Sequence, residues 1–257
     1  MSSSLPLLKQ SFRGTFIHAP EYSGGIEILR DTLIGVDQEG RIAYLQPYSA
    51  ENEAELKKKF TLPSEGIKQL DETQFFIPGF IDTHCHAPQF QFTGTGTDRD
   101  LMVWLQTYTF PAEMRMESQA LAREVYGRLV RAALSVGTTS SFYYGTIHLE
   151  STKILVDTCV ELGQRAFVGK VNMDQYAPDG YTETCEQSLK DTESFIQYVR
   201  SLDSTLVQPV ITPRFIPTCS VPLLEGLGEL ARKYDVWIQS HASESSDQVE
   251  FVRSLLP

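Results

Sequence analysis

Residues 76–92 read FIPGFIDTHCHAPQFQF, an apolar run that carries two histidines one residue apart. Side chains alternate across a strand, so His84 and His86 should share one face while Cys85 points to the other. Two imidazoles on one face are readily satisfied when both bind a divalent metal. The stretch therefore predicts a strand that ends at a metal site.

The chain after residue 75 alternates apolar strand candidates with helical stretches, which is typical of βα units around a parallel sheet. A complete eight-unit barrel needs about 250 residues by itself. We therefore expect an α/β fold over residues 76–257, in which a TIM-type (β/α) barrel is partial and has about five of its eight units. The expected strands are 76–84, 137–145, 165–173, 206–215 and 236–244, and the expected helices are 116–136, 151–163, 184–202, 221–234 and 245–256.

Residues 1–75 differ from the rest of the chain and predict a small β-rich segment. Strand candidates lie at 11–19, 32–45 and 66–76, with a turn at Asp37 to Gly40. One charged helical patch, ENEAELKKKF, lies between them at 51–60. We therefore expect two domains, an N-terminal β-rich segment (1–75) and an incomplete barrel (76–257).

The charge balance limits the partners that the chain can have. It carries 33 acidic and 22 basic residues, a formal net charge of -11, and has no arm rich in lysine or arginine. Such a surface repels a polyanion, so nucleic acid is not expected as a partner. No stretch resembles a signal peptide or a membrane span, and the four cysteines form no C-x-x-C pair. These features predict a cytoplasmic protein with no membrane partner.

The carboxyl ends of the expected strands carry the residues that chemistry would use, because functional side chains gather there in parallel βα folds. For any single histidine, a structural hydrogen-bonded role is the alternative. A pair spaced for one face, joined by a third histidine at an equivalent strand end, favours a metal site. Imidazole ligands suit one zinc ion, with Fe²⁺ as a substitute. The strand-end rule selects Asp82, His84, His86, Tyr143, Tyr144, Asn172, Asp174, Arg214, His241 and Glu244.

Two polar residues near these strand ends, Glu244 and Arg214, have two readings each. Glu244 follows His241 by three residues and could move protons between a metal-bound water and a substrate nitrogen, or could cap the next helix. Arg214 could offer its planar fork to a carbonyl and a ring nitrogen, as arginine does to guanine, or could form an ion pair. Gln89 could add amide contacts to the same ligand.

With these residues in place, the chain resembles the amidohydrolase superfamily, and within it the guanine deaminase family. The superfamily pattern is the first-strand H-x-H, here in PGFIDTHCH at 78–86, joined to a later histidine, here His241. Together with the stretches quoted in the next sentence, this pattern spans nearly the entire chain. The closer match rests on FRGTFIHAP (12–20), WLQTYTFPAE (104–113), GQRAFVGKVNMD (163–174), TPRF (212–215) and IQSHASE (238–244).

The resemblance implies a zinc hydrolase that converts guanine to xanthine and ammonia. It implies a TIM-type barrel, a small β domain built from both chain ends, and a homodimer for the complete enzyme. Residue by residue, it makes His84, His86 and His241 metal ligands, Glu244 the proton shuttle, and Gln89, Arg214, Phe215 and Trp104 contacts to the purine.

One departure from the family pattern leaves alternatives open. The family takes a further histidine and a metal-binding aspartate from later strands, and this sequence stops before either. The site is therefore expected to be partial, and this form could be a silent fragment that binds a partner or regulates the intact enzyme. Another alternative is a deaminase of a different aminated heterocycle or of an s-triazine. Neither H-x-E with P-C-x-x-C nor H-E-x-x-H occurs, which argues against cytidine deaminase and zincin sites.

Overall fold

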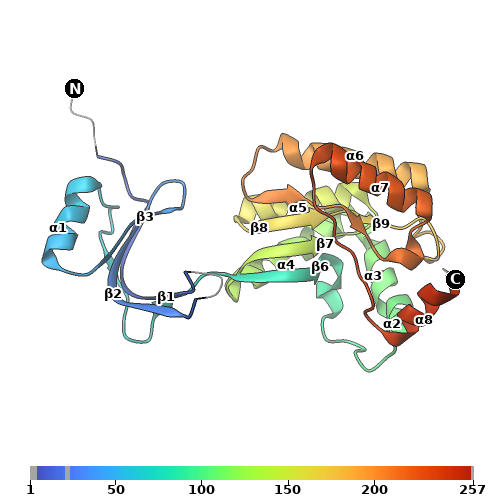
Figure 1. Cartoon of the computed structure of the whole chain (residues 1–257), viewed down its shortest axis with the longest axis horizontal. Coiled ribbons are helices and arrows are strands. Elements are labelled where there is room, and N and C mark those ends of the chain that lie inside the picture. Colours follow the sequence, from blue (N-terminus) through green and yellow to red (C-terminus); the bar gives the residue numbers. More distant parts are fainter. Residues whose placement is uncertain (1–4, 21–23, 256–257) are drawn as a thin grey trace. The chain divides into compact units, whose positions relative to one another are not determined.

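The computed structural model describes residues 5–20 and 24–255, and the chain divides into two compact units, one up to Pro78 and one from Gly79 onward. The first unit is a sheet with one helix (Figure 1). Its elements are β1 (Gln10–His18), β2 (Glu27–Val36), β3 (Ile42–Pro47), α1 (Ala50–Lys59), β4 (Lys68–Gln69) and β5 (Phe75–Phe76).

In the first unit, β1, β2 and β3 pair antiparallel, and β4 and β5 both pair parallel with β1. Ser49 begins α1, because its side chain accepts a hydrogen bond from the backbone N–H of Asn52. The expected strand 66–76 is instead two short strands. Asp71 holds a turn between them by accepting hydrogen bonds from the backbone N–H and the hydroxyl of Thr73.

The second unit is built on a parallel sheet in the order β10-β8-β7-β6, with a separate parallel pair of β9 and β11. This arrangement confirms the predicted α/β class with a partial barrel. The strands are β6 (Phe80–His86), β7 (Thr138–Tyr144), β8 (Arg165–Gly169), β9 (Val171–Asn172), β10 (Val207–Pro209) and β11 (Thr212–Pro213).

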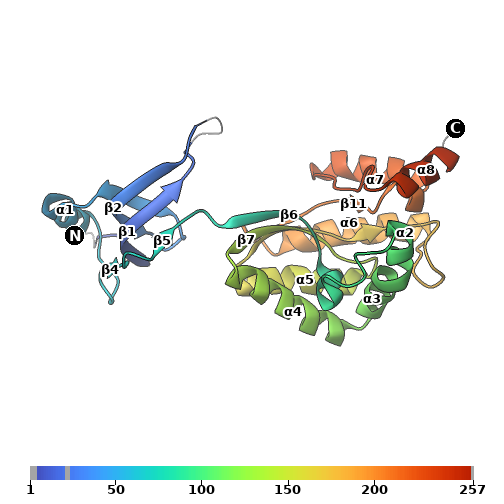
Figure 2. The same cartoon turned by 90° about the horizontal axis from the view of Figure 1, so that it is seen from below.

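The large helices follow one another along one face of this sheet, each packed on the next (Figures 1 and 2). Their apolar sides and the strands enclose a core that includes Tyr126, Leu155, Val168 and Phe195. In the described part of the chain, no helix is long and apolar enough to span a membrane. These helices are α4 (Gln119–Ser135), α5 (Leu149–Leu162), α6 (Cys185–Ser201) and α7 (Val221–Tyr234). A further helix, α8 (Ser246–Leu255), lies outside this row.

The opposite face of the sheet carries a row of aromatic rings. Phe142 stacks on Phe167 with ring centroids 4.3 Å apart, and Phe167 stacks on Trp237 at 5.1 Å. Phe142 and Phe167 alternate along their strands with Tyr143 and Val168, which lie in the helix-covered core. The sheet therefore has two apolar faces, as a parallel barrel strand does.

The expected strands at 206–215 and 236–244 differ from the observed ones. The first is divided into β10, which pairs with β8, and β11, which pairs with β9. The second forms only isolated parallel bridges, Ile211 with Ile238 and Phe215 with His241. The backbone N–H of His241 still donates to the carbonyl of Arg214 at 3.1 Å, which fixes the position of this histidine.

A helical excursion after β6 was not predicted from the sequence, yet it carries several site residues. It runs through a 3-10 helix (Ala87–Phe92), α2 (Leu101–Trp104), a π-helical turn (Leu105–Thr109) and α3 (Phe110–Met114). Gln89, Trp104 and Glu113 lie on it. Because it leaves from the carboxyl end of β6, it returns these residues to the end of the sheet where the histidines lie.

Candidate metal centre

Three imidazoles meet at the carboxyl end of the sheet. His84 and His86 end β6, and His241 lies beside Arg214 and Phe215. Nε2 of His86 is 2.9 Å from Nε2 of His241, which in turn is 3.2 Å from Nε2 of His84. Cys85 packs instead against the helix-covered core. The alternation of the strand thus brings the two histidines of the H-x-H motif to the third.

The hydrogen bonds of His241 indicate why these nitrogens converge. Its Nδ1 lies 2.6 Å from the carbonyl oxygen of Arg214, and a carbonyl only accepts, so Nδ1 donates and Nε2 keeps a free lone pair. Ligand nitrogens around a tetrahedral zinc ion lie about 3.3 Å apart when each Zn–N distance is 2.0–2.1 Å. The three Nε2 atoms are therefore close enough to bind one divalent metal ion. The hydrogen bond at Nδ1 of His241 leaves the lone pair of its Nε2 free for that ion.

Burial keeps two of the imidazoles neutral at pH 7. It lowers the pKa of His86 well below the ordinary value, and the positive charge of Arg214 adds to the effect. Burial also lowers the pKa of His241 to about 4. A neutral imidazole is the form that binds a metal. Tyr144 stacks on His86, with ring centroids 4.5 Å apart, and limits the rotation of that ring.

Arg214 is buried and paired with a residue that sequence reasoning missed. Its Nη1 donates to Oε2 of Glu113 at 2.6 Å, and the hydroxyl of Tyr181 donates to the same oxygen at 2.7 Å. Burial alone would lower the pKa of Arg214, but the charge of Glu113 outweighs it, and the net pKa is raised. The guanidinium therefore stays charged. Glu113 ends the stretch 104–113 that carried the family resemblance, which was the available signal.

A cavity of about 370 Å³ opens beside the histidines. Its size is within the range of small-molecule sites. Every residue to which the family resemblance gives a role lies on the wall of this cavity. The lining includes His84, His86, Gln89, Trp104, Arg214, Phe215, His241 and Glu244, together with Gln248, which the sequence reasoning did not select.

Glu244 lies at the exposed side of this cavity, just before α8. Among the described residues its carboxylate makes no hydrogen bond or ion pair. Its backbone N–H donates to Oε1 of the buried Gln248 at 2.6 Å, which anchors the loop. The carboxylate is thus held at the cavity and remains available to a ligand.

Several other residues at strand ends do not reach the cavity and have structural partners. Asn172 donates to the hydroxyls of Ser188 and Thr192 at 2.9 and 2.7 Å. Asp174 accepts from the backbone N–H of Ser220 at 2.7 Å, ahead of α7. Tyr143 donates to Gln164 at 2.9 Å. The strand-end rule therefore selects more residues than the site uses.

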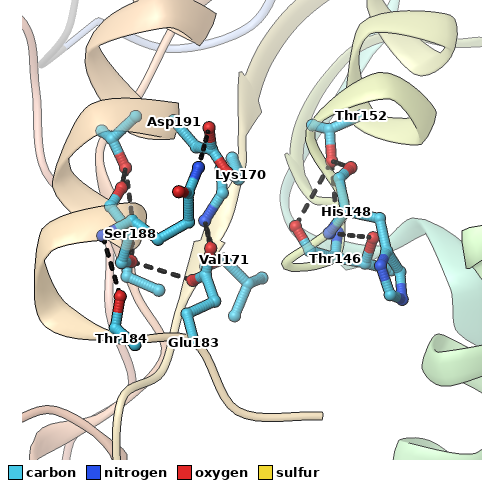
Figure 3. Close-up of polar contacts among 12 residues, drawn as sticks. Thr146, His148, Thr152, Lys170, Val171, Glu183, Thr184, Ser188 and Asp191 are labelled. Carbon is cyan, nitrogen blue, oxygen red and sulfur yellow. Dashed lines mark hydrogen bonds and ion pairs between the residues drawn. The ribbon is translucent and has the colours of Figure 1, made fainter. Parts of the chain in front are cut away.

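A second buried polar cluster lies outside the cavity, where β8 and β9 meet α6 (Figure 3). Nζ of Lys170 forms an ion pair with Oε1 of Glu183 at 2.6 Å and donates to the carbonyl of Val171 at 3.1 Å. The other oxygen of Glu183 accepts from Ser188 at 2.8 Å. Both charged groups therefore have partners within the protein.

Comparison with known proteins relates the chain to one family. The model of the amidohydrolase family matches residues 75–255. The chain is 44% identical to guanine deaminase of Dictyostelium discoideum over 96% of its length and 56% of that protein. It is 43% identical to guanine deaminase of Homo sapiens, covering all of this chain and 56% of that protein.

Solved structures agree with these matches. The crystal structure of guanine deaminase from C. acetobutylicum, with guanine bound in its active site, superposes with a TM-score of 0.84 at 36% identity. The match covers 96% of this chain and 56% of that one. The chain thus spans about half the length of the proteins it matches. With the family model matching most of its residues and the H-x-H histidines joined in space to His241, the chain belongs to the amidohydrolase family.

Proposed function

We propose that this chain binds one zinc ion through His84, His86 and His241 and serves the hydrolytic deamination of guanine to xanthine and ammonia. The observation that carries the proposal is the convergence of three Nε2 atoms on the wall of a cavity that also contains a buried arginine. Iron could replace zinc at the same imidazoles. Guanine is proposed because the relatives above are guanine deaminases, one of them with guanine bound.

The polar residues of the cavity are suited to a purine. Arg214 gives one N–H to Glu113, and no other side-chain hydrogen bond of its guanidinium is found among the described residues. Its remaining N–H groups can donate to a ring carbonyl and the adjacent nitrogen, as arginine does to O6 and N7 of guanine. Gln89 adds an amide on the same wall, and Trp104 and Phe215 provide apolar surface for a flat ring.

The reaction needs water to add at C2 of guanine and the exocyclic amine to leave as ammonia. A divalent ion held by the three imidazoles would supply Lewis acidity, which makes water nucleophilic near neutral pH. Glu244 is proposed to take one proton of the attacking water and give it to the ring nitrogen next to C2. It would then pass the proton of the new C2 hydroxyl to the exocyclic amine, which leaves as ammonia while the C2 carbonyl forms. Arg214 and Gln89 would orient the base so that C2 faces the histidines.

Metal binding and turnover are separate tests, because the chain spans about half the length of its relatives. Zinc affinity of the purified chain can be measured by competition with a chromogenic chelator, and turnover by the appearance of xanthine from guanine. The proposal predicts one zinc per chain and loss of binding when His86 is changed to Asn. A chain that takes up no zinc, or that binds it equally well without His86, would refute it.

The choice of substrate can be tested through Arg214. Changing it to alanine should reduce turnover of guanine more than turnover of a non-purine substrate such as an s-triazine. Equal losses for both would argue that Arg214 does not read the purine.

A second candidate function is favoured by the aromatic face of the sheet. Trp237 and Ile81 are 65% and 64% exposed there, which is unusual for large apolar side chains and typical of a surface that another chain covers. In that case this chain is a catalytically silent binding module. Zinc binding without any turnover, together with association in size-exclusion chromatography, would support this candidate, and clear turnover by the monomer would exclude it.

A further inference from the structure

The carboxylate of Glu113 uses its two oxygens differently. Oε2 accepts from both Arg214 and Tyr181, whereas Oε1 is buried and has no hydrogen-bond partner among the described residues. A buried carboxylate oxygen without a donor costs desolvation free energy, and such atoms are rare in folded proteins. The second oxygen therefore needs an explanation.

The nearest candidate donor is on a histidine of the metal centre. Oε1 of Glu113 lies 3.8 Å from Nδ1 of His86, whose side chain is 8% exposed. Nδ1 of His86 is itself buried and makes no hydrogen bond within the part of the chain that the structure describes. The distance is longer than a hydrogen bond, but a shift of less than about 1 Å would make one. A potential donor, Nδ1 of His86, and a potential acceptor, Oε1 of Glu113, thus lie near each other beside the three imidazoles.

A comparison within the chain shows that this arrangement is not what an ion pair alone requires. Arg13 and Asp31, at the surface of the first unit, pair through two parallel bonds of 2.6 and 3.0 Å. This two-pronged geometry is the stronger way to pair arginine with a carboxylate. Glu113 presents a single oxygen to Arg214 and leaves the other directed at the histidine.

We propose that Glu113 is a positioning residue that orients His86 through Oε1 and Arg214 through Oε2, and so links the metal side of the cavity to its purine side. When Nδ1 of His86 donates to Oε1, the lone pair of Nε2 faces His84 and His241. This is the carboxylate–histidine contact that commonly supports metal-bound histidines. The inference rests on the proposed function, since it assigns Glu113 a part in the same site.

The test compares the zinc affinity of the full chain with that of three variants. Glu113→Gln should weaken zinc binding by about tenfold to a hundredfold, the usual effect of losing such a contact. Glu113→Asp should recover part of the affinity. Tyr181→Phe is the matched control, because it removes a hydrogen bond from the same carboxylate at Oε2 only, and it should leave zinc affinity within about threefold. Thermal unfolding of each metal-free variant measures stability separately.

Three results would be decisive against the inference or its basis. Glu113→Gln binding zinc as tightly as the wild type would overturn the inference while leaving the proposed function intact. Equal losses of affinity in Glu113→Gln and Tyr181→Phe would also overturn it, because the effect would then follow general loosening of the carboxylate. A wild-type chain without zinc affinity would overturn the proposed function, and the inference with it.

A measurement on the wild-type chain decides the matter if Glu113→Gln does not fold. In the zinc-loaded protein labelled with ¹⁵N, the Nδ1 proton of His86 should exchange with water much more slowly than that of His84, which is exposed. Equal exchange rates for the two rings would contradict a hydrogen bond from His86 to Glu113.

Discussion

The histidine site (His84, His86, His241 and Glu113) and the lysine cluster (Lys170, Glu183 and Ser188) both bury charge. His84 and His86 end β6, and Lys170 follows β8, which belongs to the same parallel sheet. In the lysine cluster, Lys170 and Glu183 neutralise each other, and Ser188 saturates the second carboxylate oxygen (Figure 3). In the histidine site, Nδ1 of His86 and Oε1 of Glu113 have no hydrogen-bond partner in residues 5–20 and 24–255. Three Nε2 atoms also face one another there. The two regions have similar residue types but differ in how completely those residues are satisfied.

This difference separates a structural role from a binding role. Buried polar groups that are fully paired stabilise a particular arrangement of the chain. Buried polar groups that converge on a point without a partner leave free energy to be gained from a ligand. Lys170 therefore belongs to the fold, where it ties β8 to the segment before α6. The three histidines, in contrast, are expected to gain their stability from a metal.

The largest effect should come from breaking the lysine cluster. Lys170→Met would leave the carboxylate of Glu183 buried and uncompensated, which typically costs about 3–5 kcal/mol. Urea unfolding of the metal-free chain measures this loss. Lys233→Met, which removes a lysine from a surface ion pair, should leave the free energy of unfolding nearly unchanged. A small effect of Lys170→Met would mean that this cluster is not structural.

Changing His86 to Asn should affect zinc affinity strongly and stability weakly, the opposite of Lys170→Met. Zinc affinity should fall more than about a hundredfold, because loss of a ligand exceeds loss of its supporting hydrogen bond. The free energy of unfolding without metal should fall less than in Lys170→Met. His148→Asn is the control, since His148 lies outside the cavity. Zinc competition and urea unfolding are measured on the same samples. A large loss of unfolding free energy with little change in zinc affinity would contradict the prediction, because the histidine would then have a structural role like that of Lys170.

Acidification should weaken the metal-free histidine site. The pKa of His241 is about 4 in the folded chain and about 6.5 when unfolded, so the unfolded state binds the proton more tightly. The contribution of His241 to stability is therefore fully present above pH 6.5 and is lost as the pH drops toward 4. Between pH 7 and pH 5 this residue alone should cost about 2 kcal/mol. Urea unfolding of His241→Asn at both pH values should show a smaller loss of unfolding free energy between pH 7 and pH 5 than the wild type. The same loss in both proteins would contradict the prediction.

The smallest effect is expected at the rim of the cavity. Gln248→Ala removes the acceptor of the Glu244 backbone N–H and should cost about 1 kcal/mol. Hydrogen exchange at the Glu244 amide should become faster while zinc affinity stays the same. Loss of zinc affinity in this variant would show that the rim and the metal centre are not independent.

Much of the fold follows from local patterns. The apolar stretches that precede His84, Tyr144 and Asn172 do form strands, because regular alternation and flanking turns leave few other conformations. The first strand begins only at Phe80, however, and the third is divided into β8 and β9. The edge of the sheet was harder to predict. Residues 236–244 have a strand-like sequence, yet whether they pair regularly depends on which strand lies beside them, and a sequence pattern does not contain that information.

The candidate site shows the same division. His84 and His86 could be placed together from their spacing alone, and His241 by the rule for strand ends. Glu113 and Gln248 could not be selected this way, because they come from short helices whose position depends on tertiary packing. Glu113 lies in the stretch 104–113 that resembles the family, but the resemblance does not show which residues its carboxylate contacts. The distance of 2.6 Å between its Oε2 and Nη1 of Arg214 does.

The most direct test of the central claim is anomalous X-ray scattering at the zinc absorption edge from crystals of this chain grown with zinc. One strong peak is expected, about 2.0–2.1 Å from the Nε2 atoms of His84, His86 and His241. A peak bound elsewhere, or none at these three imidazoles, would contradict the claim.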